Sequence, residues 1–184
     1  MDRDAAWDLL CEYTKGDGLR KHGLAVEAVM RHFARKHGEE EDAWGVVGLI
    51  HDFDYEVHGE RHPMDAEPIL RERGLSEHAI VAIQGHGNHT GVARESLMAK
   101  VLYSVDELAG FVTAVALVRP SKSVHDLEPR SVRKKMKDKG FARSVSREDI
   151  TQGAEELGVD LNDHIADVIE AMRGVAGELG LAGE

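Results

Sequence analysis

The sequence predicts an all-α protein that forms a single-domain helical bundle. Apolar residues recur at spacings of three and four along most of the chain, which is the pattern of helices with one buried face. Strand patterns of period two, and Asn-Gly turns between apolar segments, are nearly absent. The 184 residues suffice for one domain with a sizeable core. We therefore expect residues 1–184 to form one domain.

The first three predicted helices follow from their apolar pattern. Residues 19–36 carry an apolar residue every three or four positions, so one face of this helix is expected to be buried. Residues 42–52 are apolar almost all round, which predicts a central helix. Pro63, Pro68 and Gly74 punctuate the next stretch, and its helical part is predicted over residues 64–73.

The next two helices are predicted from their end signals as well. Ser76 is a suitable N-cap for a helix that runs to residue 83 and ends near two glycines. Residues 95–118 form a long helical pattern, which Pro120 closes because proline cannot continue a helix. This helix is expected to be the longest in the protein.

The C-terminal part, residues 148–184, is predicted to be helical too. Ser146, followed three residues later by Asp149, resembles a capping box at the start of a helix. Residues 161–172 supply a last amphipathic helix, which could pack internally or against a second subunit. A homodimer is therefore one expectation of the sequence.

Composition and charge limit the function classes. The net charge of −11 argues against general nucleic-acid binding and against binding to anionic membranes. The longest apolar run near mid-chain, residues 114–118, is far short of the roughly 20 residues that span a bilayer. The start, MDRDAAWD, lacks the pattern of a secretory signal, and the single cysteine, Cys11, can form no internal disulfide. We expect a soluble, cytoplasmic protein.

Four ionisable residues fall where the helical pattern predicts burial. His22 lies on the apolar face of its helix, and His51 and Asp52 end the most apolar helix. Asp106 interrupts the apolar face of the longest helix. Burying a carboxylate without a compensating charge costs several kcal/mol or more. Two such histidines and two such carboxylates offset one another best around a cation, so this set predicts a metal site.

The same four residues resemble the HD superfamily of metal-dependent phosphohydrolases. Its motif is a histidine, an adjacent histidine and aspartate, and a distant aspartate, and His22, His51, Asp52 and Asp106 match that order and helical placement. The resemblance covers residues 19–118, which we expect to be the metal-binding core of an HD-type bundle. The segments VDELAGFVTAVALVRPSK and SVRKKMKDKGFA are similar to a small bacterial branch of HDIG-related proteins.

The resemblance also implies a second metal site. The stretch RHPMDAEPIL looks like the one that supplies the third histidine of two-metal HD proteins, here His62, and AIQGHGNHTGV looks like the one that supplies the fourth. His86 is the expected fourth ligand, and His89, three residues later, stays an alternative. In HDIG proteins Ile-Gly follows the dipeptide, whereas this chain has Phe53 and Asp54; the ligands are intact, but the resemblance carries no particular substrate.

The expected chemistry follows from the ligand types. Imidazole and carboxylate without thiolate suit one or two divalent ions, namely manganese, iron, nickel, zinc or magnesium. Asp52 would bridge two ions about 3.5–4 Å apart, with His51 as its neighbouring ligand, and a metal-activated water would attack phosphorus. Asp54 could bind metal, accept a proton from the leaving group, or form a local cap or salt bridge. Glu107 is expected to lie behind the ligands or in solvent, and Asn88 could reach a phosphate.

One segment is strongly basic in an otherwise acidic chain. Residues 119–147 contain ten Lys and Arg residues against three acids. The segment could be a solvated face or mobile loop, or a phosphate clamp over the metal site. The candidate substrate-binding residues are Lys122, Arg133, Lys134 and Lys137.

The sequence therefore favours a metal-dependent phosphohydrolase. The expected reaction is hydrolysis of a phosphomonoester or phosphodiester of a small, nucleotide-like molecule, with "nucleotide-like" supplied by the family resemblance. The alternatives are a hydrolase of dinucleoside polyphosphates, a metal-dependent nucleotide sensor that does not turn its ligand over, and a helical protein whose histidines are scattered without a shared role.

Overall fold

The protein is an all-α, single-domain bundle in a computed structural model that describes residues 1–183. The helices of the first half are α1 (Arg3–Tyr13), α2 (Asp17–His37), α3 (Glu41–Ile50), α4 (Tyr55–His58), α5 (Glu67–Glu72) and α6 (Glu77–Gln84). Those of the second half are α7 (Leu97–Leu117), α8 (Pro129–Met136), α9 (Arg147–Leu157), α10 (Leu161–Arg173) and α11 (Ala176–Leu179). Short 3₁₀ turns lie at Gly59–Arg61 (η1), Met64–Ala66 (η2) and Asn88–Thr90 (η3). Residues 1–183 contain no β-strand, which confirms the predicted fold class.

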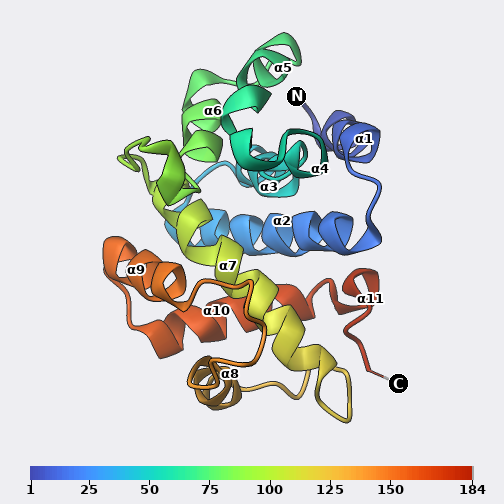
Figure 1. The fold of residues 1–184 in the computed structure, drawn as a ribbon, viewed down its shortest axis with the longest axis vertical. Coiled ribbons are helices and arrows are strands. Elements are labelled where there is room, and N and C mark those ends of the chain that lie inside the picture. Colours follow the sequence, from blue (N-terminus) through green and yellow to red (C-terminus); the bar gives the residue numbers. More distant parts are fainter. Residues whose placement is uncertain (184) are drawn as a thin grey trace.

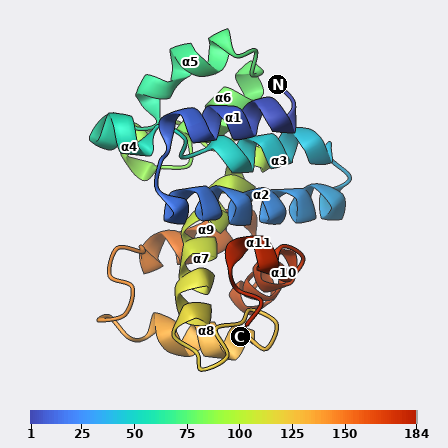
Figure 2. The same ribbon diagram turned by 90° about the vertical axis from the view of Figure 1, so that its right-hand side faces the viewer.

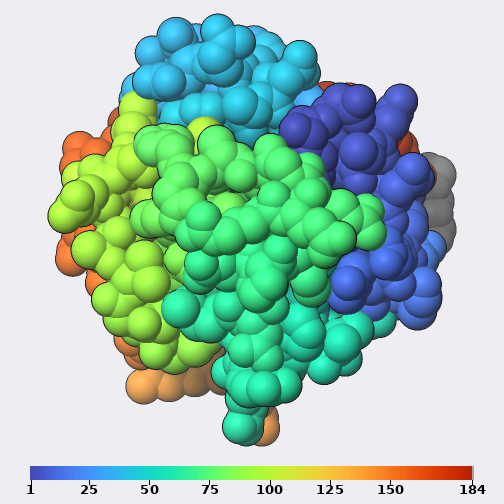
Figure 3. Space-filling view, turned by 90° about the horizontal axis from the view of Figure 1, so that it is seen from above, coloured from blue at the N-terminus to red at the C-terminus, as the bar shows by residue number. Residues whose placement is uncertain are grey.

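The helix α2 lies at the centre of the bundle. Figures 1 and 2 show α1 and α3 stacked on one side of it, while α10 and α11 lie on the other. The long helix α7 crosses α2 and continues into the half that contains α8, α9 and α10. At the end seen in Figure 3, the chain from α4 to α6 covers the molecule between α1 and the residues around η3.

Two glycines let α2 and α3 approach closely. A Cβ atom on Gly23 of α2 would lie 2.7 Å from the carbonyl oxygen of Leu49, and one on Gly48 of α3 would lie 2.8 Å from that of Val26. Both distances are too short for a side chain, so only glycine permits this packing. The close approach brings the end of α3 next to the first turns of α2, where His22 lies.

The long predicted helices agree with the structure. Helix α7 begins after the N-cap Ser96, whose side chain accepts a hydrogen bond from the Ala99 amide, and α6 is capped by Ser76 as expected. The predicted helix over residues 64–73 is a 3₁₀ turn followed by α5. Helix α10 packs internally, against α2, α7 and α8. None of the helices in residues 1–183 is long and apolar enough to cross a membrane.

Helices α1 and α8 have no counterpart among the predicted helices. Asp2 caps α1 by accepting a hydrogen bond from the Ala5 amide, and α1 buries only Ala6, Leu9 and Leu10. Helix α8 buries Val132 alone. Each therefore has too few buried apolar positions for its period to stand out in the sequence.

Candidate metal centre

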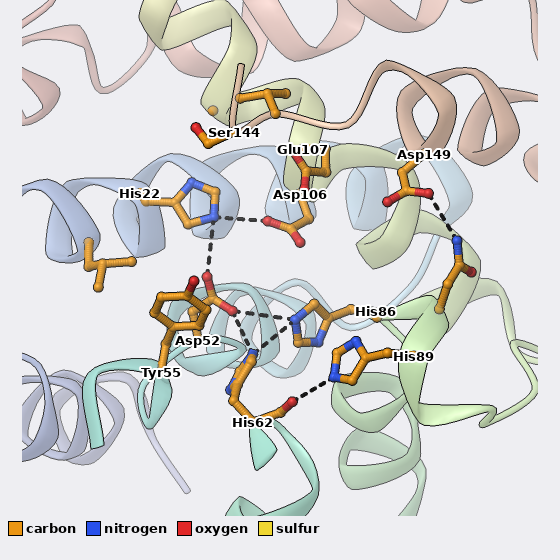
Figure 4. A pocket seen from close by; sticks show the side chains of 15 residues that line it. His22, Asp52, Tyr55, His62, His86, His89, Asp106, Glu107, Ser144 and Asp149 are labelled. Atoms are coloured by element: carbon orange, nitrogen blue, oxygen red, sulfur yellow. Dashed lines mark hydrogen bonds and ion pairs between the residues drawn. The ribbon is translucent and has the colours of Figure 1, made fainter. Parts of the chain in front are cut away.

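The histidines and aspartates singled out in the sequence meet where α2, the turn after α3 and α7 come together (Figure 4). His22 is on α2, His51 and Asp52 follow directly on α3, and Asp106 lies in the middle of α7. The Nε2 atom of His22 is 2.9 Å from Oδ1 of Asp106 and 3.7 Å from Oδ2 of Asp52. The Nε2 atom of His51 is 3.3 Å from Asp106 Oδ1 and 3.5 Å from Asp52 Oδ2. These four residues form a group that could hold a metal ion.

A second group shares Asp52 with the first. The Nε2 atom of His62 lies 2.9 Å from Oδ1 of Asp52, and that of His86 lies 3.3 Å from the same oxygen. The two Nε2 atoms are 3.2 Å apart. Asp52 therefore turns one oxygen toward His22 and His51 and the other toward His62 and His86. This is the arrangement in which one carboxylate can serve two cations.

Hydrogen bonds on the far side of the rings orient three of the four histidines. The Nδ1 atom of His51 is 2.8 Å from the carbonyl oxygen of Gly48, and that of His86 is 2.5 Å from the carbonyl oxygen of Ile83. A carbonyl oxygen can only accept, so each Nδ1 carries a proton and donates it. A neutral ring then has its lone pair on Nε2, and both Nε2 atoms face Asp52. Histidine ligands of metals are held in this way in proteins.

The third oriented ring is that of His62, and its partner is Asp54. The Nδ1 atom of His62 lies 2.6 Å from Oδ1 of Asp54, while Nδ1 of His58 lies 2.8 Å from Oδ2. Asp54 has no exposed side-chain surface, and burial would raise its pKa. The hydrogen bonds from His62 and His58 together with the charge of His62 outweigh burial and lower the pKa. Of the roles considered for Asp54, the local salt bridge is the one the structure shows. His58, which the sequence leaves without a role, takes part in it.

The ionisable groups at the centre shift one another's pKa values. Burial alone would raise the pKa of Asp52, but the charge of His51 and the hydrogen bonds from His62 and His86 hold it well below its usual range. Burial opposes protonation of His62, yet Asp52 and Asp54 outweigh burial and raise its pKa to about 9. The carboxylates therefore favour positive charge close to the histidines, supplied either by protons on the rings or by a bound cation.

Asp106 and the remaining buried histidines follow the same rule. The pKa of Asp106 would be raised by burial but is lowered by the charge of His51 and the hydrogen bond from His22. The pKa values of His51 and His86 are raised, because nearby Asp52 and Asp106 outweigh the effect of burial. The donor set, imidazole nitrogen and carboxylate oxygen without thiolate, fits a divalent cation.

His86, not His89, joins the cluster. The Nε2 atom of His89 lies 2.8 Å from the carbonyl oxygen of His62 and so binds the backbone rather than Asp52. His89 lies at the wall of the pocket, beside His86 (Figure 4). The second metal-capable group therefore consists of Asp52, His62 and His86.

A pocket of about 580 Å³ opens in front of the two groups. Its wall includes five of the six expected ligands, and His51 lies behind them without exposed surface. The other lining residues are Leu19, Tyr55, Gly87, Asn88, His89, Glu107, Gly110, Ser144, Val145 and Asp149. Glu107, expected behind the ligands or in solvent, thus faces the pocket, and burial together with Asp106 raises its pKa to about 7.

The predicted capping box at the start of α9 is completed by Glu107 rather than by the side chain of Asp149. Ser146 caps the helix as expected, with Oγ accepting from the Asp149 amide at 3.1 Å. The Asp149 carboxylate does not return the bond to Ser146; instead Glu107 of α7 accepts from the Ser146 amide at 3.1 Å. Asp149 accepts from Asn88 and from the Tyr103 hydroxyl, at 2.9 and 3.0 Å. Its side chain is thereby placed at the pocket.

The four basic residues expected to clamp a phosphate are not brought to this pocket. Arg133, Lys134 and Lys137 line a separate pocket along α8, and Lys122 lies in the exposed turn after α7. The segment 119–147 reaches the metal-capable pocket only through Ser144 and Val145. The physical reason is that α8 turns its single buried residue, Val132, inward, so its basic residues face solvent.

The fold and the site define an all-α protein with a shared histidine and aspartate cluster that could hold metal. Comparisons of the chain with models of protein families, with curated proteins and with solved structures gave no match.

Proposed function

We propose that the protein is a metal-dependent phosphohydrolase of the HD type. The observation that carries the proposal is the position of Asp52, whose two oxygens face two separate sets of histidine nitrogens at 2.9–3.7 Å. His22, His51, Asp52 and Asp106 would hold one divalent ion, and Asp52, His62 and His86 a second. The order of these residues along the chain is also the order in which the resemblance to the HD superfamily places them.

Bound divalent ions would supply Lewis acidity toward phosphoryl oxygens and lower the pKa of an attacking water. The chain contributes preorganisation. The carbonyl groups of Gly48 and Ile83 fix the rings of His51 and His86, and Asp54 fixes that of His62, so that little reorganisation is needed when ligands bind. The pocket in front of the ligands has room for a nucleotide-sized molecule, since sites for small ligands measure roughly 300–1,000 Å³.

Metal analysis and turnover test this proposal together. Protein purified without a histidine tag should contain a transition metal, and after loading with manganese or iron it should hydrolyse aryl phosphomonoesters or phosphodiesters. Asp52→Ala removes the shared ligand, so we expect metal content to fall and turnover to drop by about a thousandfold or more. The measurements are atomic emission and product release, with the melting temperature as the check on folding.

Asp65→Ala is the matched control for this variant. Asp65 lies on the same stretch of chain, pairs with Arg61 at the surface and does not line the pocket. It should leave metal content and turnover unchanged. If the loaded protein binds metal but turns over neither the aryl esters nor any member of a nucleotide panel, the proposal fails and a sensor role takes its place.

A further inference from the structure

The pocket in front of the metal-capable cluster is lined without a single lysine or arginine among residues 1–183. Apart from the expected ligands, its acidic side chains are Glu107 of α7 and Asp149 of α9. A phosphoryl group at the cluster would be neutralised by bound cations. Any part of the substrate beyond that group would lie against a wall that contains Glu107 and Asp149 but no lysine or arginine from residues 1–183.

Both carboxylates are held in place by protein donors on one side only. Oε2 of Glu107 accepts from the Ser146 amide, and Oδ1 of Asp149 accepts from Asn88 and Tyr103. Within residues 1–183 neither Oε1 of Glu107 nor Oδ2 of Asp149 receives a hydrogen bond. In Figure 4 the second oxygen of Asp149 points away from Asn88, toward the side where Asp106 and Glu107 lie. Each carboxylate thus offers the pocket an acceptor whose position is already fixed.

Arg94 donates to Asn88 in the wall of the pocket, but its guanidinium is paired with Glu156 and lies over the ring of Tyr103. Other basic residues line a neighbouring pocket. Lys139 and Arg143 belong to its wall, and it shares Ser144 and Val145 with the metal-capable pocket. Arg147, also in that wall, donates to the carbonyl groups of Phe141, Ala142 and Val145 and stacks on Phe111, so its guanidinium is used to hold the loop. The charges that could bind a second anionic group therefore lie outside the pocket that contains the cluster.

We infer that the substrate carries one phosphoryl group and a leaving group that donates hydrogen bonds, through an amine or hydroxyl, and has no second anionic group. This inference rests on the proposed function and narrows its substrate class. In the reaction, the P–O bond to the leaving group breaks with its electron pair on that oxygen. A water oxygen forms the new bond to phosphorus, and a proton from the water ends on the leaving alcohol. Glu107 and Asp149 would accept the hydrogen bonds of the leaving group, and the carboxylate of Asp149 would repel an anionic one.

Three esters of similar size test the inference: 2-aminoethyl phosphate, 2-hydroxyethyl phosphate and phosphoglycolate. With the manganese-loaded full chain we expect kcat/KM to fall in that order, by about tenfold or more between the amine and the carboxylate, since hydrogen bonds to charged groups contribute roughly that much. Asp149→Asn keeps the shape of the side chain and should reduce this ratio to about threefold or less. Glu107→Gln makes the same test from the other helix, and melting temperatures report whether each variant is folded.

Glu155→Gln is the matched control, because Glu155 is exposed on the same helix as Asp149 and lines neither the metal-capable pocket nor its neighbour. It should leave the ratio unchanged. The inference is overturned if phosphoglycolate is preferred, or if the ratio is the same in Asp149→Asn and Glu107→Gln as in the unaltered chain. Phosphoglycolate preference that disappears in Lys139→Gln/Arg143→Gln would assign the anionic group to the neighbouring pocket. Turnover of 4-nitrophenyl phosphate and bis(4-nitrophenyl) phosphate separates the two levels: absence of turnover of both overturns the proposed function and this inference, whereas turnover of either without the expected order overturns this inference alone.

Discussion

The metal-capable pocket and the exposed face of α8 each gather several ionisable side chains, and they are built in opposite ways. In the pocket, Asp52 lies within 2.9–3.7 Å of four histidine nitrogens, and Asp54 binds two more. On α8, Arg133, Lys134 and Lys137 lie at helical spacing on the outer face and form no ion pair with any of residues 1–183.

The difference shows which charges a fold has to arrange. Removing one partner of a buried pair leaves an uncompensated charge that costs several kcal/mol, so the positions of the others depend on it. An exposed lysine is solvated by water whatever its neighbours do, and its contribution to stability is small. The buried cluster therefore has one geometry that its members determine together, whereas the basic face has only a net charge.

Among the changes considered, removal of metal should have the largest effect on stability, and it acts on the buried cluster. In metal-free protein the pKa of His62 is about 9, above its usual value near 6.5, so the protonated ring stabilises the fold fully below pH 6.5. That stabilisation is lost as the pH rises through 9 and amounts to at most about 3 kcal/mol. The lowered pKa values of Asp52 and Asp106 affect stability at acidic pH. The stability that these carboxylates contribute is present above pH 4 and is lost on acidification.

We expect the melting temperature of chelator-treated protein to fall between pH 6.5 and 9, while that of manganese-loaded protein stays level. The bound ion would replace the protons as the positive charge that Asp52 requires. Thermal denaturation at a series of pH values measures both curves. His62→Gln should flatten the metal-free curve, and His78→Gln, at an exposed position of α6, should not. A metal-free curve that rises toward pH 9 would show that protons on the histidines do not stabilise the cluster.

The helices that are predicted correctly are those with long apolar patterns. Helix α2 buries eight of its 21 residues and α7 buries 13 of its 21, which is why residues 19–36 and 95–118 stand out in the sequence. Helix α8 has one buried residue and sits inside a basic segment, so its sequence resembles a solvated loop. Its existence depends on packing against α10 and α7, which no local pattern records.

Apolar periodicity also identifies some of the candidate ligands in the sequence. His22 and Asp106 are polar residues on faces that periodicity marks as buried, and a buried polar residue calls for a partner. His62 and His86 lie in irregular segments with no such pattern, and only the family resemblance points to them. Asp54 and His58 are four residues apart, and that spacing is a usable local signal.

The roles of Glu107 and Asp149 could not be predicted locally. The pattern of Ser146 and Asp149 predicts a closed capping box, and it is correct for the serine. Glu107 lies 39 positions before Ser146 and accepts the hydrogen bond from the Ser146 amide that Asp149 would accept in a closed capping box. The side chain of Asp149 therefore faces the pocket instead. The competition between a local and a distant acceptor is decided by how α7 and α9 pack, and these helices touch where Gly153 lies against Ser104.

Replacement of Asp54 should weaken metal binding at one of the two sites. This effect should be smaller than that of removing the metal. Asp54→Asn keeps the shape of the side chain but presents an NH2 group to Nδ1 of either His58 or His62. In the molecules where it faces His62, the proton of that ring would move from Nδ1 to Nε2. Changes at such supporting residues typically cost about 10–100-fold in metal affinity. Titration calorimetry with manganese should show that loss at the site formed by Asp52, His62 and His86. The other site should bind as before.

Asp65→Asn is the matched control for this measurement, since Asp65 pairs with Arg61 at the surface of the same stretch. It should bind both ions with unchanged affinity. Two ions bound by Asp54→Asn as tightly as by the unaltered chain would show that the ring of His62 does not depend on Asp54.

The smallest effect is expected on the basic face. Arg133→Gln, Lys134→Gln and Lys137→Gln, combined in one variant, should change kcat/KM by less than about twofold and the free energy of unfolding by less than about 0.5 kcal/mol per site. The reason is that none of the three lines the metal-capable pocket. Steady-state kinetics with 4-nitrophenyl phosphate and thermal denaturation measure the two quantities.

A second variant with the same net charge shows whether any change is specific to this face. Arg35→Gln, Lys36→Gln and Arg61→Gln remove three positive charges at exposed positions elsewhere, where each has an acidic partner. Because exposed pairs contribute roughly 0–1 kcal/mol each, this control should be the less stable of the two while its kinetics stay the same. A loss of turnover confined to the α8 variant would mean that those cations reach the substrate, and the two charged regions would then act as one site.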